Sequence, residues 1–400
     1  MPVYWIWFAE LKGINLFTKR QLLEKFRDPE ELFRLEEKAL KAFPKEVIDA
    51  LQNKDLTESK QIMDRCRQKG IGILTFADAA YPESLRYIED PPLVLYFKGT
   101  LPDWQAQPVI GVVGTRKASP YGLQTAHLIS SQIAACGGLV VSGVATGIDA
   151  LAMEGALDVG KPTVGVLGCG LDVVYPASNR ALYRRTEENG CLISEYPPGT
   201  RPYGGNFLHR NRIISGVSAG LLVVEAPARS GALNTARHAF TQGRDLFVAP
   251  GNLGVDTCVG SNALLQEGAY AVLSGWDAVK HYANLYPGVV ENRPVPLRQT
   301  VQQPLPKVAE VQTRPEKEES LPQNAIDNLD KSTYSVINKR PVTLSDRENA
   351  VLALLSDIPQ LPDSVMDASD LPSSTVQSIL TRLTIKGLAI QHPDGRISRK

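Results

Sequence analysis

Two arginines flank an asparagine shortly after an aromatic residue in the segment NFLHRNRIISG, residues 206–216. A guanidinium group binds phosphate oxygens through paired hydrogen bonds, and an aromatic ring can stack on a nucleobase. The segment contains no acidic residue to neutralise Arg210 and Arg212. With Phe207, these arginines therefore have the chemistry of a nucleic-acid site. A second interpretation places Phe207 in the core and the arginines in solvent on a helix.

A second basic segment, GTRKASPYG, begins at Gly114. The glycine allows a close backbone turn, Thr115 supplies a hydroxyl group, and Arg116 and Lys117 supply cations. This is the chemistry of a phosphate-binding loop, although the segment matches neither GxGxxG nor GxxxxGK[ST]. A tight turn with solvated charges would explain it almost as well.

Small polar residues follow two further apolar segments. Ser142 and Gly143 form a turn, and Asp149 falls where a helix begins, so we expect it to cap that helix. Ser230 and Gly231 also precede a helix, with Thr235 one turn further on. Small residues at a helix N-terminus favour anion binding.

The elements that would position these residues are short apolar runs separated by helical patterns. Such alternation predicts a doubly wound, Rossmann-like α/β domain with a mostly parallel sheet, whose ligands bind beyond the carboxyl ends of the strands. The predicted strands are 109–113, 138–142, 162–168, 190–194, 220–226, 245–250 and 269–274.

The remaining sequence divides the chain into four parts. Residues 1–80 predict an N-terminal helical domain of SAM or helix-hairpin-helix type, followed by the Rossmann-like domain at 81–285 with its core at 108–283. Seven prolines indicate a linker at 286–340. At 341–400, two helices, the second at 373–386, precede a hairpin turning at Pro393, Asp394 and Gly395, which favours a winged helix.

Composition limits the function classes. Lys plus Arg equals Asp plus Glu at 43 each, so nucleic-acid binding needs a local patch. The five cysteines are scattered, and the apolar N-terminus is too short to span a bilayer. We therefore expect a cytoplasmic protein without a metal site or cofactor. HExxH and Walker A motifs are absent, which favours binding over bond breaking.

Seven blocks of this sequence resemble the DNA-processing protein A family (DprA, also called Smf). They are VVGTRKASPYG, SGVATGIDALAMEGAL, GVLGCGLDVVYPASNRAL, FLHRNRIISGVS, RSGALNTARHAF, VAPGN and GSNALLQEGA, in the family's order and spacing. The resemblance implies a dimeric, non-catalytic protein that binds single-stranded DNA and loads the recombinase RecA onto it in natural transformation.

The resemblance also implies roles for individual residues. Gly114, Thr115, Arg116, Phe207, Arg210, Asn211, Arg212, Ser230, Gly231 and Thr235 would form the DNA pocket, and Leu265 and Ala271 would lie in the dimer interface. We add Lys117, Ser142 and Gly143 to the DNA site from the turn chemistry above. Three departures predict weaker DNA binding: Leu208 replaces a frequent proline, Thr146 a frequent arginine, and 202–206 lack a basic residue.

Two other functions stay open. Related folds include phosphoribohydrolases that act on nucleoside monophosphates, but PGNLGVDTCVGSN has Asn252 at the second glycine of their PGGxGT loop and lacks the glutamate that follows it. An interaction scaffold without DNA binding is the third possibility, and the retention of Arg116, Arg210 and Arg212 argues against it.

Overall fold

The structure is a computed structural model that describes residues 1–293, 295, 346–369 and 371, together with 375–376, 379–380, 383, 388–391 and 396–399. The chain divides into two compact units, Met1–Pro306 and Lys307–Lys400. Each unit is described by itself.

The first part of the chain is helical, as predicted. An asparagine caps one of these helices, because the Asn15 side chain accepts a hydrogen bond from the backbone N–H of Thr18 at 2.9 Å. Trp5 and Phe8 share one apolar core with Leu167 and Leu182 of the α/β domain, so the two parts pack together. The helices are α1 (Pro2–Glu10), α2 (Leu16–Phe26), α3 (Pro29–Phe33), α4 (Glu37–Leu40), α5 (Lys45–Leu51) and α6 (Thr57–Lys69).

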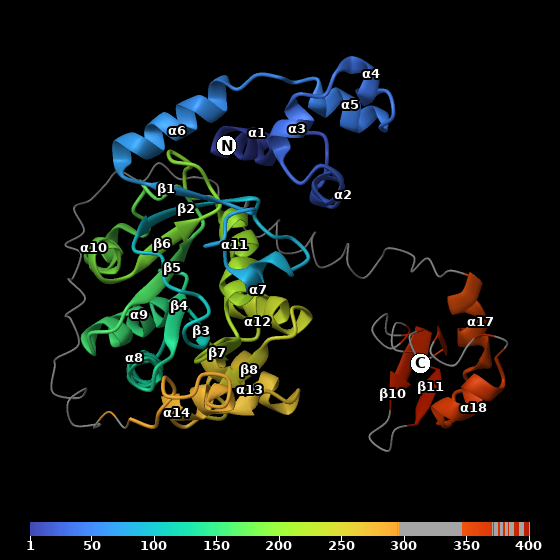
Figure 1. Ribbon diagram of the computed structural model, residues 1–400. Coiled ribbons are helices and arrows are strands. Elements are labelled where there is room, and N and C mark those ends of the chain that lie inside the picture. The colour runs from blue at the N-terminus through green and yellow to red at the C-terminus, as the bar shows by residue number, and fades with distance from the viewer. Residues whose placement is uncertain are drawn as a thin grey trace, which may run out of the picture. The chain divides into compact units, whose positions relative to one another are not determined.

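The central sheet has nine strands in the order β1-β2-β6-β5-β4-β3-β7-β8-β9 (Figure 1). All seven predicted strands are present and pair in parallel, which confirms the doubly wound fold: β3 (Val109–Val113), β4 (Leu139–Ser142), β5 (Thr163–Leu167), β6 (Cys191–Ser194), β7 (Gly220–Val223), β8 (Asp245–Val248) and β9 (Tyr270–Ala271).

Two strands were not predicted. β1 (Gly72–Thr75) and β2 (Val94–Gly99) extend the sheet antiparallel, with β2 bonded to β6. β1 falls within residues 1–80, so that segment also supplies an edge strand to the sheet. Sequence periodicity missed both strands because β1 has only four residues, and β2 follows α7 (Glu83–Arg86) and begins just after Pro91 and Pro92.

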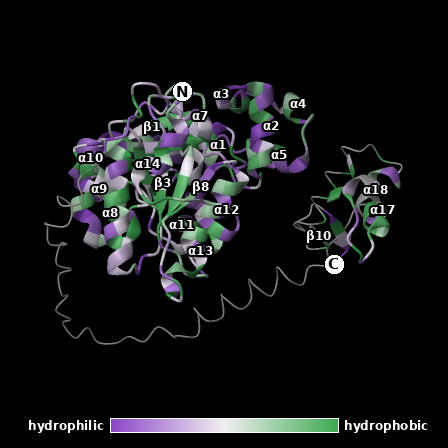
Figure 2. Cartoon of the chain, turned by 90° about the horizontal axis from the view of Figure 1, so that it is seen from below, coloured by the Kyte–Doolittle hydropathy of each residue, from purple (hydrophilic) through white to green (hydrophobic). Residues whose placement is uncertain are grey.

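Helices cover both faces of the sheet because alternate strand residues are apolar on both sides. Ile110 and Val112 pack under one group, whereas Val109 and Val113 pack under the other. Figure 2 shows the strands in the hydrophobic colours and the helices with mixed faces. One group contains α8 (Pro120–Ala135), α9 (Ile148–Asp158), α10 (Arg180–Asn189) and α14 (Gly275–Val279); the other contains α7, α11 (Gly204–Val217), α12 (Gly231–Thr241) and α13 (Val259–Gln266).

The α/β domain continues beyond its predicted end. Val290 is buried in the same core as Ile110, and the N–H of Glu291 donates to the carbonyl of Cys136 at 3.2 Å. The predicted linker boundary at 286 is therefore too early. Residues 294 and 296–340, the rest of the predicted linker, lie outside the described residues.

The second unit contains α17 (Asp346–Leu354) and α18 (Pro362–Asp367), then β10 (Ala389–Gln391) paired antiparallel with β11 (Ile397–Arg399). Val351, Val365 and Ile397 share its core. The helices and hairpin agree with the predicted winged helix. The described residues of the predicted second helix, 375–376, 379–380 and 383, are helical, whereas the turn at 393–395 lies outside the described residues.

Candidate nucleic-acid interface

A cavity of about 600 Å³ lies where the loop after β3 meets the first turns of α11 and α12. This is the carboxyl edge of the parallel strands, as the fold predicts. The structure gathers there ten of the thirteen residues predicted to bind DNA. They are Gly114, Thr115, Arg116, Lys117, Phe207, Arg210, Asn211, Ser230, Gly231 and Thr235.

The loop after β3 is fixed by the segment that follows β7, the neighbouring strand in the sheet. The N–H of Thr115 donates to the carbonyl of Glu225 at 2.7 Å, and the Thr115 hydroxyl accepts from the N–H of Lys117 at 3.2 Å. A Cβ at Gly114 would lie 2.5 Å from Ile148, so only glycine fits there. The fully buried carboxylate of Glu225 accepts hydrogen bonds from the N–H and hydroxyl of Ser119, at the start of α8.

This fixed loop presents two exposed cations to the cavity. Arg116 and Lys117 are both solvent-accessible. Within the described residues, neither side chain forms an ion pair. Their positive charge is therefore available to an anion that enters the cavity.

Arg210 lies in the wall of the cavity but is buried. Its guanidinium donates to the carbonyl of Gly143 at 2.8 Å and to that of Val166, which end two neighbouring strands. Burial raises the pKa of the adjacent Asp149 carboxyl, and the charge of Arg210 is the largest factor that opposes this rise. Asp149 was predicted only to cap α9, but it is a buried counter-charge for Arg210.

Ser142 and Gly143 do not line the cavity. The Ser142 hydroxyl is fully buried and donates to the carbonyl of Val112 at 2.6 Å. A Cβ at Gly143 would lie 2.6 Å from the Asp149 carboxylate and 2.7 Å from the Arg210 guanidinium. Gly143 therefore makes room for these two side chains, and both residues act by supporting the cavity wall.

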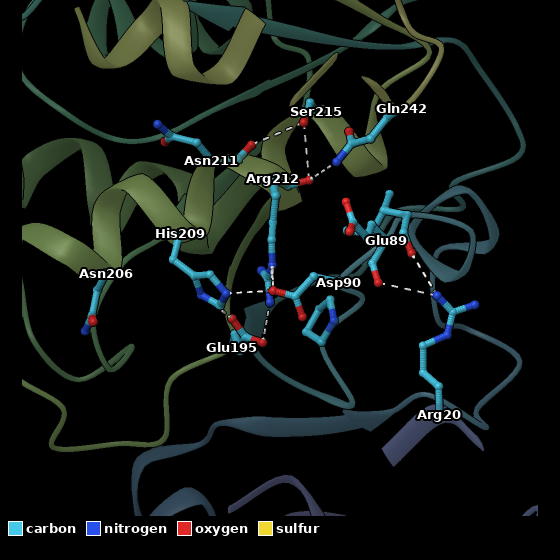
Figure 3. A network of polar contacts seen from close by, with 12 residues as sticks. Arg20, Glu89, Asp90, Glu195, Asn206, His209, Asn211, Arg212, Ser215 and Gln242 are labelled. Atoms are coloured by element: carbon cyan, nitrogen blue, oxygen red, sulfur yellow. Dashed lines mark hydrogen bonds and ion pairs between the residues drawn. The ribbon is translucent and has the colours of Figure 1, made fainter. Parts of the chain in front are cut away.

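Arg212 is the main departure from the predicted site, because it does not line the cavity and points toward Asp90 and Glu195 instead (Figure 3). Its guanidinium contacts Asp90 at 2.8 Å and Glu195 at 2.7 Å, and His209 contacts Asp90 at 2.8 Å. The prediction that Arg212 lacks acidic partners was wrong, since both partners are distant in sequence. These four residues are named the Asp90 cluster below.

Within the Asp90 cluster, attraction between opposite charges opposes the effect of burial on the carboxyl groups. Burial raises the pKa of the Glu195 carboxyl, but Arg212 and His209 outweigh that effect and the pKa is lowered. Hydrogen bonds to Asp90 and Glu195 raise the pKa of His209 to about 9. The cluster thus joins α11 to the segments that precede α11 and follow α7.

Phe207 is partly buried among several neighbours. The guanidinium carbons of Arg116 and Arg210 lie 5.6 Å and 5.9 Å from its ring centre. The Tyr175 ring is 5.3 Å away, and a Cβ at Gly168 would lie 2.7 Å from its Cδ1. The core interpretation of Phe207 holds in part, because the ring packs against the loop after β5, and the ring also lines the cavity.

The first turn of α12 closes the cavity. Ser230 caps the helix by accepting from the N–H of Ala232 at 3.2 Å, while the Thr235 hydroxyl donates to the carbonyl of Gly231 at 3.3 Å. The Asn211 amide also donates to the carbonyl of Gly231 at 3.3 Å and thereby connects α11 to α12. The helix N-terminus adds positive potential at the cavity.

Sequence reasoning missed several residues of the cavity. Arg229 and Thr257 line it, and Arg229 is exposed. The position of Arg229, directly before the small residues of the α12 turn, was a usable signal. Thr257 lies in the loop after β8 and no motif indicated it.

Within the part of the chain that the structure describes, no helix is long and apolar enough to cross a membrane. The same residues contain no group of three or more His, Cys, Asp or Glu side chains that could hold a metal ion.

Comparisons with known proteins find similar sequences and similar structures. Residues 72–283 match the family model described as DNA recombination-mediator protein A, and residues 338–395 match the DprA winged helix domain. The chain is 32% identical over 410 residues to Protein Smf of Synechocystis sp., a match that covers 99% of this chain and 98% of that protein.

Two further relatives extend this result. The DNA processing protein DprA of Bacillus subtilis is 34% identical over 269 residues, which cover 66% of this chain and 91% of that protein. The X-ray structure of DNA processing protein A from Streptococcus pneumoniae superposes with a TM-score of 0.61 at 30% identity, covering 70% of this chain and 98% of that one. The chain therefore belongs to the DNA recombination-mediator protein A family, the DprA/Smf family that its sequence motifs resemble.

Proposed function

We propose that this protein binds single-stranded DNA in the cavity at the carboxyl edge of its sheet and loads the recombinase RecA onto that strand. The observation that carries the proposal is the pair of exposed cations, Arg116 and Lys117, on a fixed loop facing the N-terminus of α12. Cations and helix N-termini both attract phosphate. Family membership supports a role in DNA recombination.

The shape of the site favours a single strand over a duplex. A cavity of about 600 Å³ is on the scale of a small ligand. The bases of a single strand can be splayed apart and enter such a cavity. The bases of a duplex are stacked and paired in the interior of the double helix and cannot enter it. Arg210 and Asn211 support this cavity, and Arg212 is not part of the proposed contact surface.

We propose in addition that two copies of the chain form a homodimer through α13 and β9. Ala271 is exposed on β9. Leu265, on the preceding helix α13, is partly buried. Phe240 is 74% exposed and Tyr270 is 51% exposed, and both line one cavity together with residues of α13. Exposed aromatic side chains of this kind favour a protein interface.

The phosphoribohydrolase alternative would require a catalytic carboxyl group, and the described residues that line the cavity include one carboxyl group, that of Asp149. A carboxyl group with a raised pKa in a cleft can act in acid–base chemistry, and Asp149 meets that description. Its position beside buried Arg210 favours a supporting role. Incubation with nucleoside monophosphates followed by chromatography of released base would reveal hydrolysis.

The decisive experiment is a titration of fluorescent oligo-dT and a matched duplex at several salt concentrations. We expect tighter binding to the single strand. Arg116→Ala and Lys117→Ala should each weaken that binding and flatten its salt dependence by about one unit of slope, because each removes one phosphate contact.

Arg184→Ala is the matched control, because this exposed arginine pairs with Glu188 at 3.6 Å on α10 and lies outside the cavity. Its affinity should equal that of the unaltered protein. If neither Arg116→Ala nor Lys117→Ala changed affinity or salt slope, the cavity would not be the DNA site.

A further inference from the structure

The cavity contains an aromatic ring whose faces are largely taken by its neighbours. Phe207 has two guanidinium groups within 5.9 Å of its ring centre and Gly168 pressed against its edge. A base that stacked on Phe207 would have to displace Arg116 or Tyr175. Phe207 is therefore poorly placed to accept a base directly.

The neighbouring ring, Tyr175, is open to solvent. It is 40% exposed, and its centre lies 5.3 Å from that of Phe207 with an interplanar angle of 32°. Tyr175 belongs to the loop after β5, on the same carboxyl edge of the sheet as the loop of Arg116. Arg116 and Tyr175 thus contact the same Phe207 ring.

The backbone of Tyr175 is held in place. The buried hydroxyl of Tyr183 donates to the carbonyl of Tyr175 at 2.8 Å and accepts from its N–H at 3.3 Å. Asn179 donates to the carbonyl of Val144 at 2.9 Å, which ties this loop to the turn after β4. An exposed ring on a fixed backbone loses little conformational freedom when a ligand binds it.

We infer that Tyr175 is the residue on which a nucleobase stacks, and that Phe207 supports the Tyr175 ring from behind. The inference rests on the proposed single-strand binding and adds a residue to that site. A strand whose phosphate binds Arg116 would place an adjacent base over Tyr175, just outside the cavity. Stacking on an aromatic ring tolerates any base, which suits a protein that binds strands of varied sequence.

The first test compares two substitutions at Tyr175. Tyr175→Ala removes the ring and should weaken oligo-dT binding about 5- to 150-fold, the range expected for one stacked base. Tyr175→Phe keeps the ring and should bind within about twofold of the unaltered protein. Tyr87→Ala is the matched control, because Tyr87 is 77% exposed and follows α7, which packs near Gly216 at the far end of α11.

The second test uses the unaltered protein and so does not depend on the folding of a variant. Oligo-dT carrying 5-iodouracil is bound and irradiated, and the crosslinked peptide is identified by mass spectrometry. We expect the crosslink on Tyr175. A crosslink on Phe207, or an unchanged affinity of Tyr175→Ala, would overturn the inference.

The failure of this inference can be told from the failure of the proposed function. If Arg116→Ala weakens binding while Tyr175→Ala does not, the cavity binds DNA and only the stacking role of Tyr175 is wrong. If neither variant changes binding, both the cavity and the stacking residue are wrong.

Discussion

Helix α11 presents arginines to two different environments. Arg210 faces the cavity beside buried Asp149. Arg212, two residues further along the helix, belongs to the Asp90 cluster. Arg210 and Arg212 each expose 3% of their surface, whereas Arg116 and Lys117 across the cavity are open to solvent. Basic residues of the predicted site thus have different roles, because burial and counter-charge decide whether a cation is available to a ligand.

The comparison separates support from recognition. Arg210 and Arg212 are buried and hold elements together, while Arg116 and Lys117 can exchange solvent for phosphate. Substitution of the buried pair should mainly reduce stability, and substitution of the exposed pair should mainly reduce affinity. The following variants test that division, beginning with the largest expected effect.

Arg212→Ala should destabilise the protein most. It leaves the carboxylates of Asp90 and Glu195 without their main counter-charge, and we expect the free energy of unfolding to fall by roughly 3 kcal/mol. Urea unfolding followed by circular dichroism measures this change, with Arg184→Ala as an exposed control near zero. A loss of DNA affinity as large as that of Arg116→Ala, at unchanged stability, would instead restore Arg212 to the binding surface.

Arg210 and Asp149 should be energetically coupled. We expect Arg210→Ala to lower the free energy of unfolding by about 2 kcal/mol, because it removes two hydrogen bonds to backbone carbonyls and the positive charge beside the Asp149 carboxyl. The double variant Arg210→Ala/Asp149→Ala should lose less than the two single variants together, by about 1–2 kcal/mol. Additive losses in this double-mutant cycle would mean that the two charges do not interact.

Gly168→Ala should have a smaller effect, on the wall of the cavity. The added methyl would lie 2.7 Å from Phe207, and accommodating it should cost about 1 kcal/mol, the low end for overpacking, because the ring is only partly buried. Gly204→Ala is the matched control, because nothing lies within 4 Å of its added methyl at the start of α11. Thermal unfolding of both variants checks this prediction. Equal melting temperatures would show that Phe207 moves aside freely.

Local signals predicted much of the fold and of the cavity. Continuous apolar runs gave seven strands, and small or basic residues directly after β3 and β7 marked the loops that meet at the carboxyl edge. These features depend on neighbouring residues alone. Ten of the predicted DNA-site residues consequently lie in the cavity.

Long-range partners could not be predicted in this way. Asp90 is 122 residues from Arg212, and no local rule connects them. The helix-start position of Asp149 indicated a cap, but the folded chain brings Arg210 to it. The antiparallel addition of β1 and β2 depends on an open edge at β6, which exists only once the sheet has formed.

The smallest effect should come from His209 and should depend on pH. Its pKa is raised to about 9 by hydrogen bonds to Asp90 and Glu195, so its charged form stabilises the folded state. This contribution is complete below its ordinary pKa of about 6.5 and is lost as the pH rises through about 9. Because 47% of the side chain is exposed, solvent screening limits the effect to about 1 kcal/mol or less. His209→Gln should therefore be less stable than the unaltered protein at pH 6 and equally stable at pH 10. A stability difference that stayed constant over this range would show that His209 acts through packing, because packing does not titrate.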